Sequence, residues 1–356
     1  MKDVLKVWPM ILNEKETKDV KETYFFDFTD NKSESCGLEI KNSSCQFIDG
    51  EPKEHTIKIS TETKELLSYF SKMKKIDDLK ITIKGDDKKL AKFQKYFSGQ
   101  PEGHQITNES YAETENEKEI REGKWTKPKK VLILSGSPRK ERGATAIVYN
   151  IFKQGLDKSN CEVDVIHVAD LENKLCKGCF TCWGKTRKCI YKDDTNELIL
   201  KFHTYDLLVL ATPVYVDGLP GALKNVIDRT IAILDPEFLN KDEHCRHPVR
   251  YPRMPHLLLL STIGFTEMDN FTPMIDHVQK ICKNMHLTYV GEVLPPTGWM
   301  LYIPNLKPLY KNITEAIKQA AIEIVQKGKI PKELQEVIET PIFTRGQITA
   351  IHHRGG

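Results

Sequence analysis

The feature that most constrains the fold is a series of short apolar runs that alternate with helical stretches. The first run, 131–134 (VLIL), contains no polar residue, as expected of a parallel strand that is covered on both faces. Four more strand candidates follow at 162–168, 206–211, 256–262 and 287–293, with helical stretches at 144–156, 219–233, 271–284 and 309–326. This alternation predicts a doubly wound α/β fold with a five-stranded parallel sheet. Ligands of such folds bind beyond the carboxyl ends of the strands.

A polar and charged segment, 108–130 (NESYAETENEKEIREGKWTKPKK), separates this region from the part of the chain before it. That earlier part places short strand candidates first and helices later, which is an α+β pattern. We therefore predict a smaller α+β domain at 1–105, a charged linker at 106–128, the α/β domain at 129–328 and a C-terminal tail at 329–356.

Composition limits the function classes. The 53 Lys and Arg residues nearly balance the 50 Asp and Glu residues, giving a net charge of +3. Nucleic-acid binding is not expected, because phosphate neutralisation requires a strong basic excess. The N-terminal stretch is a poor signal peptide, and we find no apolar run near the roughly 20 residues of a spanning helix. The sequence thus predicts a cytoplasmic protein with no membrane span.

The loop after the first strand, 135–145 (SGSPRKERGAT), leads directly into a helical stretch. A helix N-terminus binds anions because its first N–H groups are unpaired and carry partial positive charge. Ser137 and Thr145 add hydroxyl donors, and Arg139 adds a charged fork that suits phosphate. We predict an anion site here, the alternative being an ordinary strand-to-helix turn. The loop has neither the Walker pattern nor G-x-G-x-x-G.

Two motifs in this order resemble a known family. The loop is similar to the S-x-P-R-x-x-G-x-T phosphate loop of NADPH-dependent FMN reductases and iron–sulfur flavoproteins. The stretch 211–229 (ATPVYVDGLPGALKNVIDR) resembles the family's A-T-P-x-Y-x-x-x-x-P-x-x-L-K-x-x-I-D-R. The resemblance implies a flavodoxin-like fold, FMN as cofactor, NAD(P)H as electron donor and assembly as a homo-oligomer. It assigns two loops to FMN, consisting of Ser135, Ser137, Arg139, Gly143, Ala144 and Thr145 at the phosphate and Pro213, Val214, Tyr215, Val216, Asp217 and Gly218 at the ring.

A third loop follows the fourth strand candidate and belongs to the same edge of the predicted sheet. Gly264 permits close approach of the backbone to a ligand. We predict flavin contacts from Ser261, Thr262 and Gly264, the alternative being a plain strand-to-helix turn.

Four of the nine cysteines fall in one short segment, with the spacing C-x2-C-x2-C-x6-C at Cys176, Cys179, Cys182 and Cys189. Such spacing can bring four thiolates to one iron–sulfur cube. It resembles the compact motif that holds a [4Fe–4S] cluster in archaeal iron–sulfur flavoproteins, and it also resembles flavodoxin-like oxidoreductases in which no cluster need be assumed. Free or structural thiols, a reversible cysteine pair and zinc are therefore left open beside the cluster.

The N-terminal region has a diffuse resemblance to the sterol carrier protein type 2 domain. The resemblance rests on apolar patterning and on the turn 83–86 (IKGD), and it implies a pocket for an apolar ligand. Phe70, Phe93 and Phe97 at helical spacing are equally typical of a packed core.

The leading functional hypothesis is an FMN-dependent NAD(P)H oxidoreductase that reduces a quinone, a flavin, an azo or nitro compound, or a protein acceptor. No catalytic acid or base is assigned, because hydride chemistry belongs to the flavin. The alternatives are an electron carrier of the iron–sulfur flavoprotein type and a lipid-binding module coupled to a flavin domain.

Overall fold

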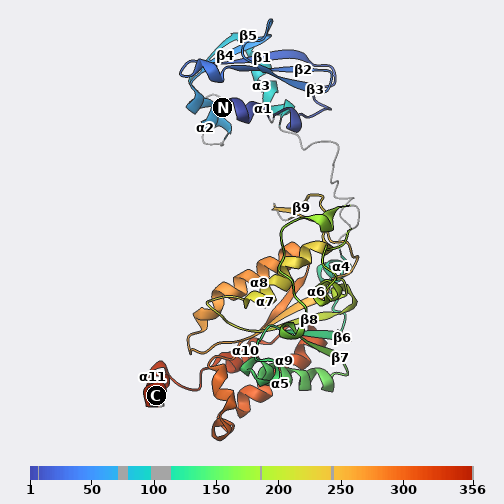
Figure 1. The fold of residues 1–356 in the computed structure, drawn as a ribbon, viewed down its shortest axis with the longest axis vertical. Coiled ribbons are helices and arrows are strands. Elements are labelled where there is room, and N and C mark those ends of the chain that lie inside the picture. The colour runs from blue at the N-terminus through green and yellow to red at the C-terminus, as the bar shows by residue number, and fades with distance from the viewer. Residues whose placement is uncertain (7, 71–78, 98–113, 185–186, 242–243, 355–356) are drawn as a thin grey trace. The chain divides into compact units, whose positions relative to one another are not determined.

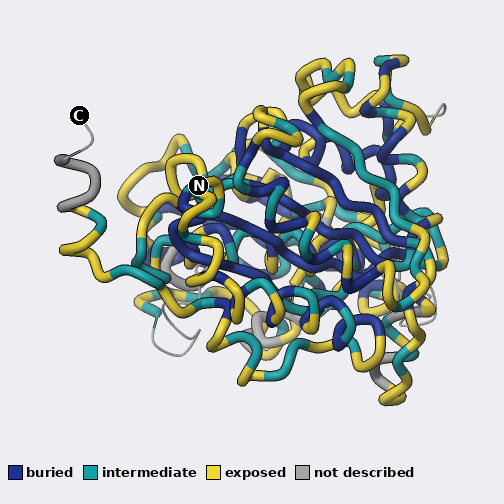
Figure 2. The backbone as a smooth tube through the Cα atoms, turned by 90° about the horizontal axis from the view of Figure 1, so that it is seen from below, coloured by how far each residue is buried: buried dark blue, intermediate teal, exposed yellow. Residues whose placement is uncertain are grey.

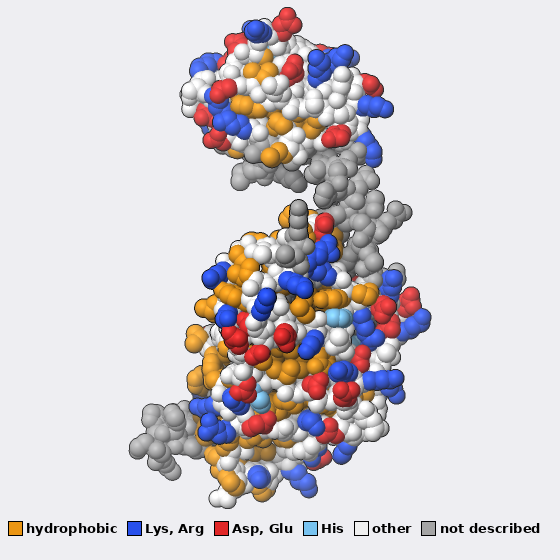
Figure 3. Space-filling model, turned by 45° about the vertical axis from the view of Figure 1, so that its right-hand side comes forward, with side chains coloured by type: hydrophobic (Ala, Val, Ile, Leu, Met, Phe, Trp, Pro, Cys, Tyr) orange, Lys and Arg blue, Asp and Glu red, His pale blue; other side chains and the backbone are white. Residues whose placement is uncertain are grey.

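The computed structural model describes residues 1–356 apart from residues 7, 71–78, 98–113, 185–186, 242–243 and 355–356. The chain divides into two compact units, Met1–Thr107 and Asn108–Gly356 (Figure 1). Within the described part, no helix is both long and apolar enough to cross a bilayer. On the face drawn in Figure 3, Lys and Arg side chains are interspersed with Asp and Glu.

The first unit is built on one mixed sheet with the strand order β3-β2-β1-β4-β5. Its strands alternate between the two faces, as in β4, where buried and half-buried residues follow one another. The unit consists of α1 (Lys2–Lys6), β1 (Lys21–Phe28), β2 (Cys36–Lys41), β3 (Ser44–Asp49), β4 (Ile57–Thr61), α2 (Thr63–Phe70), β5 (Ile81–Gly85) and α3 (Asp87–Tyr96), with 3-10 turns at Trp8–Ile11 and Lys32–Glu34. The end of the predicted helix 61–73 lies outside the described residues.

Aromatic rings fill the core of the first unit. Phe93 of α3 lies 4.5 Å from Tyr24, 5.7 Å from Phe26 and 5.3 Å from Trp8, measured between ring centroids. These rings contribute large apolar area and favourable tilted contacts. The arrangement accounts for the helical spacing of aromatic residues as core packing. Binding of an apolar ligand by this unit, and its likeness to a sterol carrier domain, remain predictions.

The second unit confirms the predicted α/β fold with a five-stranded parallel sheet. Its strand order is β12-β11-β8-β6-β7, which places the first strand of the unit between the second and third. This is the flavodoxin-like order. The strands are β6 (Lys130–Ser135), β7 (Glu162–His167), β8 (Leu207–Pro213), β11 (His256–Thr262) and β12 (Thr288–Val293).

Helices cover both faces of this sheet (Figure 1). Val131 and Ile133 face the core on the side of α5 and α9, whereas Leu132 and Leu134 face the core on the side of α7 and α8. The buried backbone in Figure 2 follows these strands. The helices are α5 (Ala144–Lys158), α6 (Asp194–Ile199), α7 (Gly221–Arg229), α8 (Thr272–Met285), α9 (Lys311–Lys327), α10 (Lys332–Glu339) and α11 (Arg345–Arg354).

The described part of the predicted linker 106–128 is not a simple connection. Helix α4 (Glu115–Arg121) lies in it, and the Glu115 N–H donates to the Pro252 carbonyl over 3.0 Å. The Trp125 indole N–H donates to the Val325 carbonyl at the end of α9, over 3.0 Å. The high charge of the segment concealed these contacts, in which Trp125 is a large apolar anchor.

The predicted tail 329–356 is also partly structural. Helix α10 packs on α9, and its residue Ile338 is fully buried in the core of the second unit.

A two-stranded hairpin, β9 (Leu239–Lys241) and β10 (His244–Arg246), occupies the excursion before β11. Each strand of this hairpin has only three residues, so periodicity gives little signal for it, whereas α10 carries an amphipathic pattern in its sequence.

Candidate flavin site and cysteine pocket

The sheet order brings the three loops predicted for FMN to one edge. Strands β6, β8 and β11 are neighbours, and their pairing places Ser135 opposite Ala211 and Thr262 opposite Pro213. Backbone contacts then join the loops, because the Gly136 N–H donates to the Ala211 carbonyl over 2.8 Å and the Val214 N–H donates to the Thr262 carbonyl over 3.0 Å. The three loops therefore form one continuous surface at the carboxyl ends of the strands.

The first loop ends in an uncapped helix. Gly143 is the N-cap of α5 and offers no side-chain cap, and the first turn of this 15-residue helix carries no acidic residue. The first N–H groups of the helix are thus available to an anion. Ser137 and Thr145 are buried beside them, whereas Arg139 is exposed. The hydroxyl of Ser135 is buried and has no hydrogen-bond partner in the structure.

Close packing explains the glycine at this N-cap. A Cβ atom on Gly143 would lie 2.6 Å from Ser137 Oγ, closer than real contacts allow. Ser137 Oγ also accepts the Arg139 N–H over 3.3 Å, and the hydroxyls of Thr145 and Thr262 are 3.0 Å apart. The unpartnered hydroxyl, the open helix end and the tight glycine together fit a phosphate cradle.

The second loop is a tight hairpin that projects from the edge. Tyr215 and Gly218 exchange two backbone hydrogen bonds of 3.0 and 3.1 Å, and the central residues Val216 and Asp217 have φ angles of 47° and 60°. Two positive φ angles define a type I′ turn, which favours Asn, Asp and Gly and strains a β-branched residue. The Val216 side chain is nevertheless fully exposed. Strain and apolar exposure coincide at functional sites more than elsewhere.

This hairpin gives a first prediction. Replacing Val216 by Asn should raise the free energy of unfolding by about 1 kcal/mol, because Asn tolerates the left-handed region. Urea titration followed by circular dichroism measures this. The control Val337→Asn changes a partly exposed Val on α10, where a helix is weakened rather than relieved of strain. Equal destabilisation of both variants would show that the Val216 backbone is not strained.

The third loop is held from behind by the segment after the fifth strand, where the sequence offers Trp299 and Tyr302 either as walls of the flavin pocket or as packing residues. The Gly298 N–H donates to the Ile263 carbonyl over 2.9 Å, and the Trp299 indole N–H donates to the Gly264 carbonyl over 3.0 Å. A Cβ atom on Gly298 would lie 2.8 Å from Thr262 Cβ. Ser261 Oγ donates to the Thr212 carbonyl over 2.8 Å. The sequence signal for this support was the aromatic pair Trp299 and Tyr302, and it did not reveal the role of Gly298.

The four clustered cysteines line one pocket. Cys176 and Cys179 are exposed, Cys189 is half-buried and Cys182 is buried, and the pocket between them has a volume of about 70 Å³. Organic ligands occupy pockets of roughly 300–1,000 Å³, so this volume suits a smaller group. Burial raises the pKa of the Cys182 thiol, whereas the Thr181 hydroxyl lowers the pKa of the Cys179 thiol.

The thiols do not form a single-ion site. Zinc requires four ligands that converge within about 2.3 Å of one point. Among the described residues, no three His, Cys, Asp or Glu side chains converge in that way. A cube instead binds each thiolate through a different iron, so its ligands line a cavity rather than meet at a point. The shared cavity is therefore compatible with a cluster.

Buried polar residues anchor the cysteine segment, and sequence reasoning gave them no role in this pocket. Arg229 is paired with both carboxylate oxygens of Asp193 at 2.6 Å, and Asp193 also caps α6 by accepting the Asn196 N–H over 3.1 Å. Arg250 donates to the carbonyls of Cys182 and Arg187, each over 2.9 Å. The local sequence around each arginine carries no sign of these distant partners.

Among the residues that the structure describes, the histidines near β9 and β10 do not converge with other ligand side chains on a metal site. His247 contacts the Glu237 carbonyl over 2.9 Å and lies 4.6 Å from the Trp183 ring, so its role is to pack the hairpin on the cysteine segment. Asp242 of the same excursion lies outside the described residues.

Part of the second unit is similar in sequence to known flavoproteins. Residues 129–246 match the NADPH-dependent FMN reductase family. An iron–sulfur flavoprotein from Archaeoglobus fulgidus is 35% identical over 101 residues, which cover 28% of this chain and 48% of that protein. One from Methanosarcina thermophila is 28% identical over 114 residues, covering 32% and 59%. The chain thus spans about half the length of the curated relatives that it matches.

Solved structures of similar fold include an FMN-dependent NADH-azoreductase from Bacillus anthracis, at 16% identity and a TM-score of 0.43 over 55% of this chain and 99% of that one. An NAD(P)H:quinone oxidoreductase from Methanothermobacter marburgensis has 13% identity and a TM-score of 0.40, over 56% and 98%. The region 129–246 contains the phosphate loop, the hairpin and all four clustered cysteines. The FMN reductase match therefore covers the first two loops of the candidate flavin site and the cysteine pocket's four thiols, but it ends before the third loop.

Proposed function

We propose that this protein is an FMN-dependent NAD(P)H oxidoreductase that passes electrons to a small-molecule or protein acceptor. The observation that carries the proposal is the uncapped N-terminus of α5, which lies beside buried Ser137 and Thr145 and the unpartnered Ser135 hydroxyl. It falls within the region that matches the FMN reductase family. One phosphate loop and no dinucleotide fingerprint favour FMN over a dinucleotide flavin.

The chain's own residues supply binding and orientation. Ser137, Thr145 and the first N–H groups of α5 would hold the phosphate, and Arg139 would add a charged donor. The hairpin Pro213–Gly218 and the loop of Ser261, Thr262 and Gly264 would line the ring. When bound, FMN accepts a hydride from nicotinamide and can release electrons singly or in pairs. The apolar Val216 and the half-exposed Tyr215 would limit access of water to that face.

We further propose that Cys176, Cys179, Cys182 and Cys189 hold a [4Fe–4S] cluster. The supporting observations are the shared pocket and the thiol donor set, together with relatives that are named iron–sulfur flavoproteins. Such a cluster supplies one-electron transfer. The exposure of Cys176 and Cys179 specifically favours the second candidate function, an electron carrier that exchanges single electrons with a protein partner at this surface.

Two measurements on the full chain test these proposals. Anaerobic purification followed by visible spectroscopy should show the two flavin bands, and broad absorbance that dithionite bleaches should accompany them if iron is bound. Oxidation of NADH and NADPH is then followed with a quinone, a nitro compound or an azo dye as acceptor. Steady turnover supports the reductase, whereas reduction without turnover supports the carrier. A colourless protein that retains no FMN after reconstitution contradicts both.

A further inference from the structure

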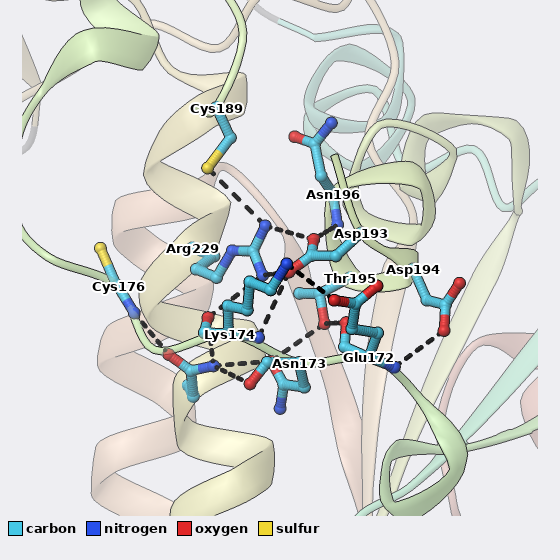
Figure 4. A network of polar contacts seen from close by, with 11 residues as sticks. Glu172, Asn173, Lys174, Cys176, Cys189, Asp193, Asp194, Thr195, Asn196 and Arg229 are labelled. Atoms are coloured by element: carbon cyan, nitrogen blue, oxygen red, sulfur yellow. Dashed lines mark hydrogen bonds and ion pairs between the residues drawn. The ribbon is translucent and has the colours of Figure 1, made fainter. Parts of the chain in front are cut away.

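We propose that Arg229 is the positioning residue of the cysteine pocket: it donates an N–H···S hydrogen bond to Cys189 and so holds and tunes the last of the four cluster ligands. This inference rests on the proposed [4Fe–4S] cluster. The Arg229 Nη2 lies 3.6 Å from Cys189 Sγ, and Figure 4 shows the guanidinium between this sulfur and the Asp193 carboxylate. Arg229, Asp193 and Asn225 are 2%, 4% and 5% exposed.

The guanidinium is fixed on its other sides. Both terminal nitrogens donate to Asp193 at 2.6 Å, and Nη1 also donates to the Lys174 carbonyl over 3.2 Å. The Tyr191 ring centroid lies 5.4 Å from Cζ. A fork that is held by a carboxylate and an aromatic face has little freedom, so the second N–H of Nη2 has a defined direction, while Nε is buried without a hydrogen-bond partner. That direction leads to the sulfur of Cys189.

One helix controls both ends of the cysteine segment. Asn225 and Arg229 are four residues apart on α7 and share a face. The Asn225 side chain accepts the Cys176 N–H over 2.9 Å and donates to the Asn173 side chain over 2.6 Å, while Arg229 reaches Cys189. The same helix begins three residues after the hairpin of the candidate flavin site. Helix α7 therefore follows the hairpin closely along the chain and contacts both the first and the last of the four cysteines.

The N–H···S contact of Arg229 would have a defined role if a cluster is bound. Hydrogen bonds to ligand sulfurs are among the factors that set the reduction potential of an iron–sulfur cluster, and residues behind the ligands orient them. Asp193 already balances the charge of Arg229, so the extra N–H would bond more strongly to an anionic cluster-ligand sulfur than to a neutral thiol. A merely structural Arg229–Asp193 pair would not need to lie against Cys189. The Arg229 N–H donor and the four-thiol pocket thus both support an iron–sulfur cluster as the occupant.

The test compares variants that keep the fold with variants that remove the donor. Arg229→Met alone would leave the Asp193 carboxylate buried and unpaired, so it is combined with Asp193→Asn, which keeps a side-chain oxygen for the cap of α6 and leaves the net charge unchanged. Asn225→Ala is the matched control, because it removes the anchor of Cys176 from the same helix but no donor to sulfur. Thermal unfolding of the iron-free proteins shows whether each variant folds.

Iron and acid-labile sulfide per chain are measured after anaerobic reconstitution, and the midpoint potential is measured by redox titration followed by electron paramagnetic resonance. We expect the Arg229→Met/Asp193→Asn protein to hold less than half the iron of the wild type and to be harder to reduce. Asn225→Ala should lose iron without a change in potential. An unchanged potential in the folded double variant, with iron present, overturns the role of Arg229 alone. Wild-type protein that takes up FMN but no iron overturns the cluster and this inference together.

Discussion

A chain that carries Ser137→Ala and Thr145→Val should bind FMN at least about 100-fold more weakly than the wild type. Each hydroxyl is buried beside the N-terminus of α5, where it would donate to a charged phosphate. A hydrogen bond to a charged group contributes about 1.5–3 kcal/mol, and about 1.4 kcal/mol corresponds to a tenfold change in affinity. Two such losses therefore exceed a hundredfold. Quenching of flavin fluorescence during titration of the apoprotein measures the change.

The matched control removes one serine hydroxyl and one threonine hydroxyl at other positions of the chain. Ser159→Ala and Thr314→Val lie at the far end of α5 and on α9, away from the loop. The loop variant also loses the contact between Thr145 and Thr262, so its unfolding must be compared with that of the control in the absence of FMN. FMN affinity within threefold of the wild type, in a folded loop variant, would contradict phosphate binding at α5.

The strands and their order show what the sequence could reveal. Each parallel strand is covered on both faces, so a run such as 131–134 is apolar at every position and signals its own burial. Because carboxyl ends of neighbouring parallel strands meet, the three loops could be assigned to one edge before the structure was known. The predicted boundaries of these strands lie close to the observed ones.

The supporting residues show what the sequence could not reveal. Arg229 meets Asp193 across 36 positions, and Gly298 meets Thr262 across a similar separation. Such pairs depend on the tertiary arrangement and leave no local pattern. The contacts of α4 left no local pattern for a related reason: most of the described part of the charged segment is exposed, but Glu117 pairs with Lys241 across 124 positions. A run of charges predicts a solvent-exposed segment, but it does not show which of those charges has a distant partner in the fold.

His256 should make the second unit sensitive to acid. Its ring begins β11, is 1% exposed and lies 4.6 Å from Trp125, and neither ring nitrogen has a hydrogen-bond partner in the structure. Burial, together with the charge of Arg253, lowers the pKa of His256 from 6.5 to about 4, against the opposing effect of Glu119 and Asp206. The folded state thus holds the imidazole neutral where the unfolded chain would protonate it.

The sign of the effect follows from proton linkage. Below pH 6.5 the unfolded state binds a proton that the folded state excludes, so stability falls as the pH is lowered from 6.5 to about 4 and is constant with respect to this group outside that window. At about 1.4 kcal/mol for each pKa unit, the loss approaches about 3 kcal/mol. This loss is a large share of the roughly 5–15 kcal/mol that is typical for the free energy of unfolding of a domain.

Replacing His256 by Leu should remove this loss. The substitution deletes two unpaired buried nitrogens and keeps apolar contact with Trp125, so stability at pH 7.5 should be equal to or above that of the wild type. Urea unfolding at pH 7.5 and pH 4.5, followed by the fluorescence of tryptophan, measures both. The difference between the two pH values should shrink by about 2–3 kcal/mol in the variant. An identical pH dependence in both proteins would mean that His256 is already protonated, or already paired, in the folded chain.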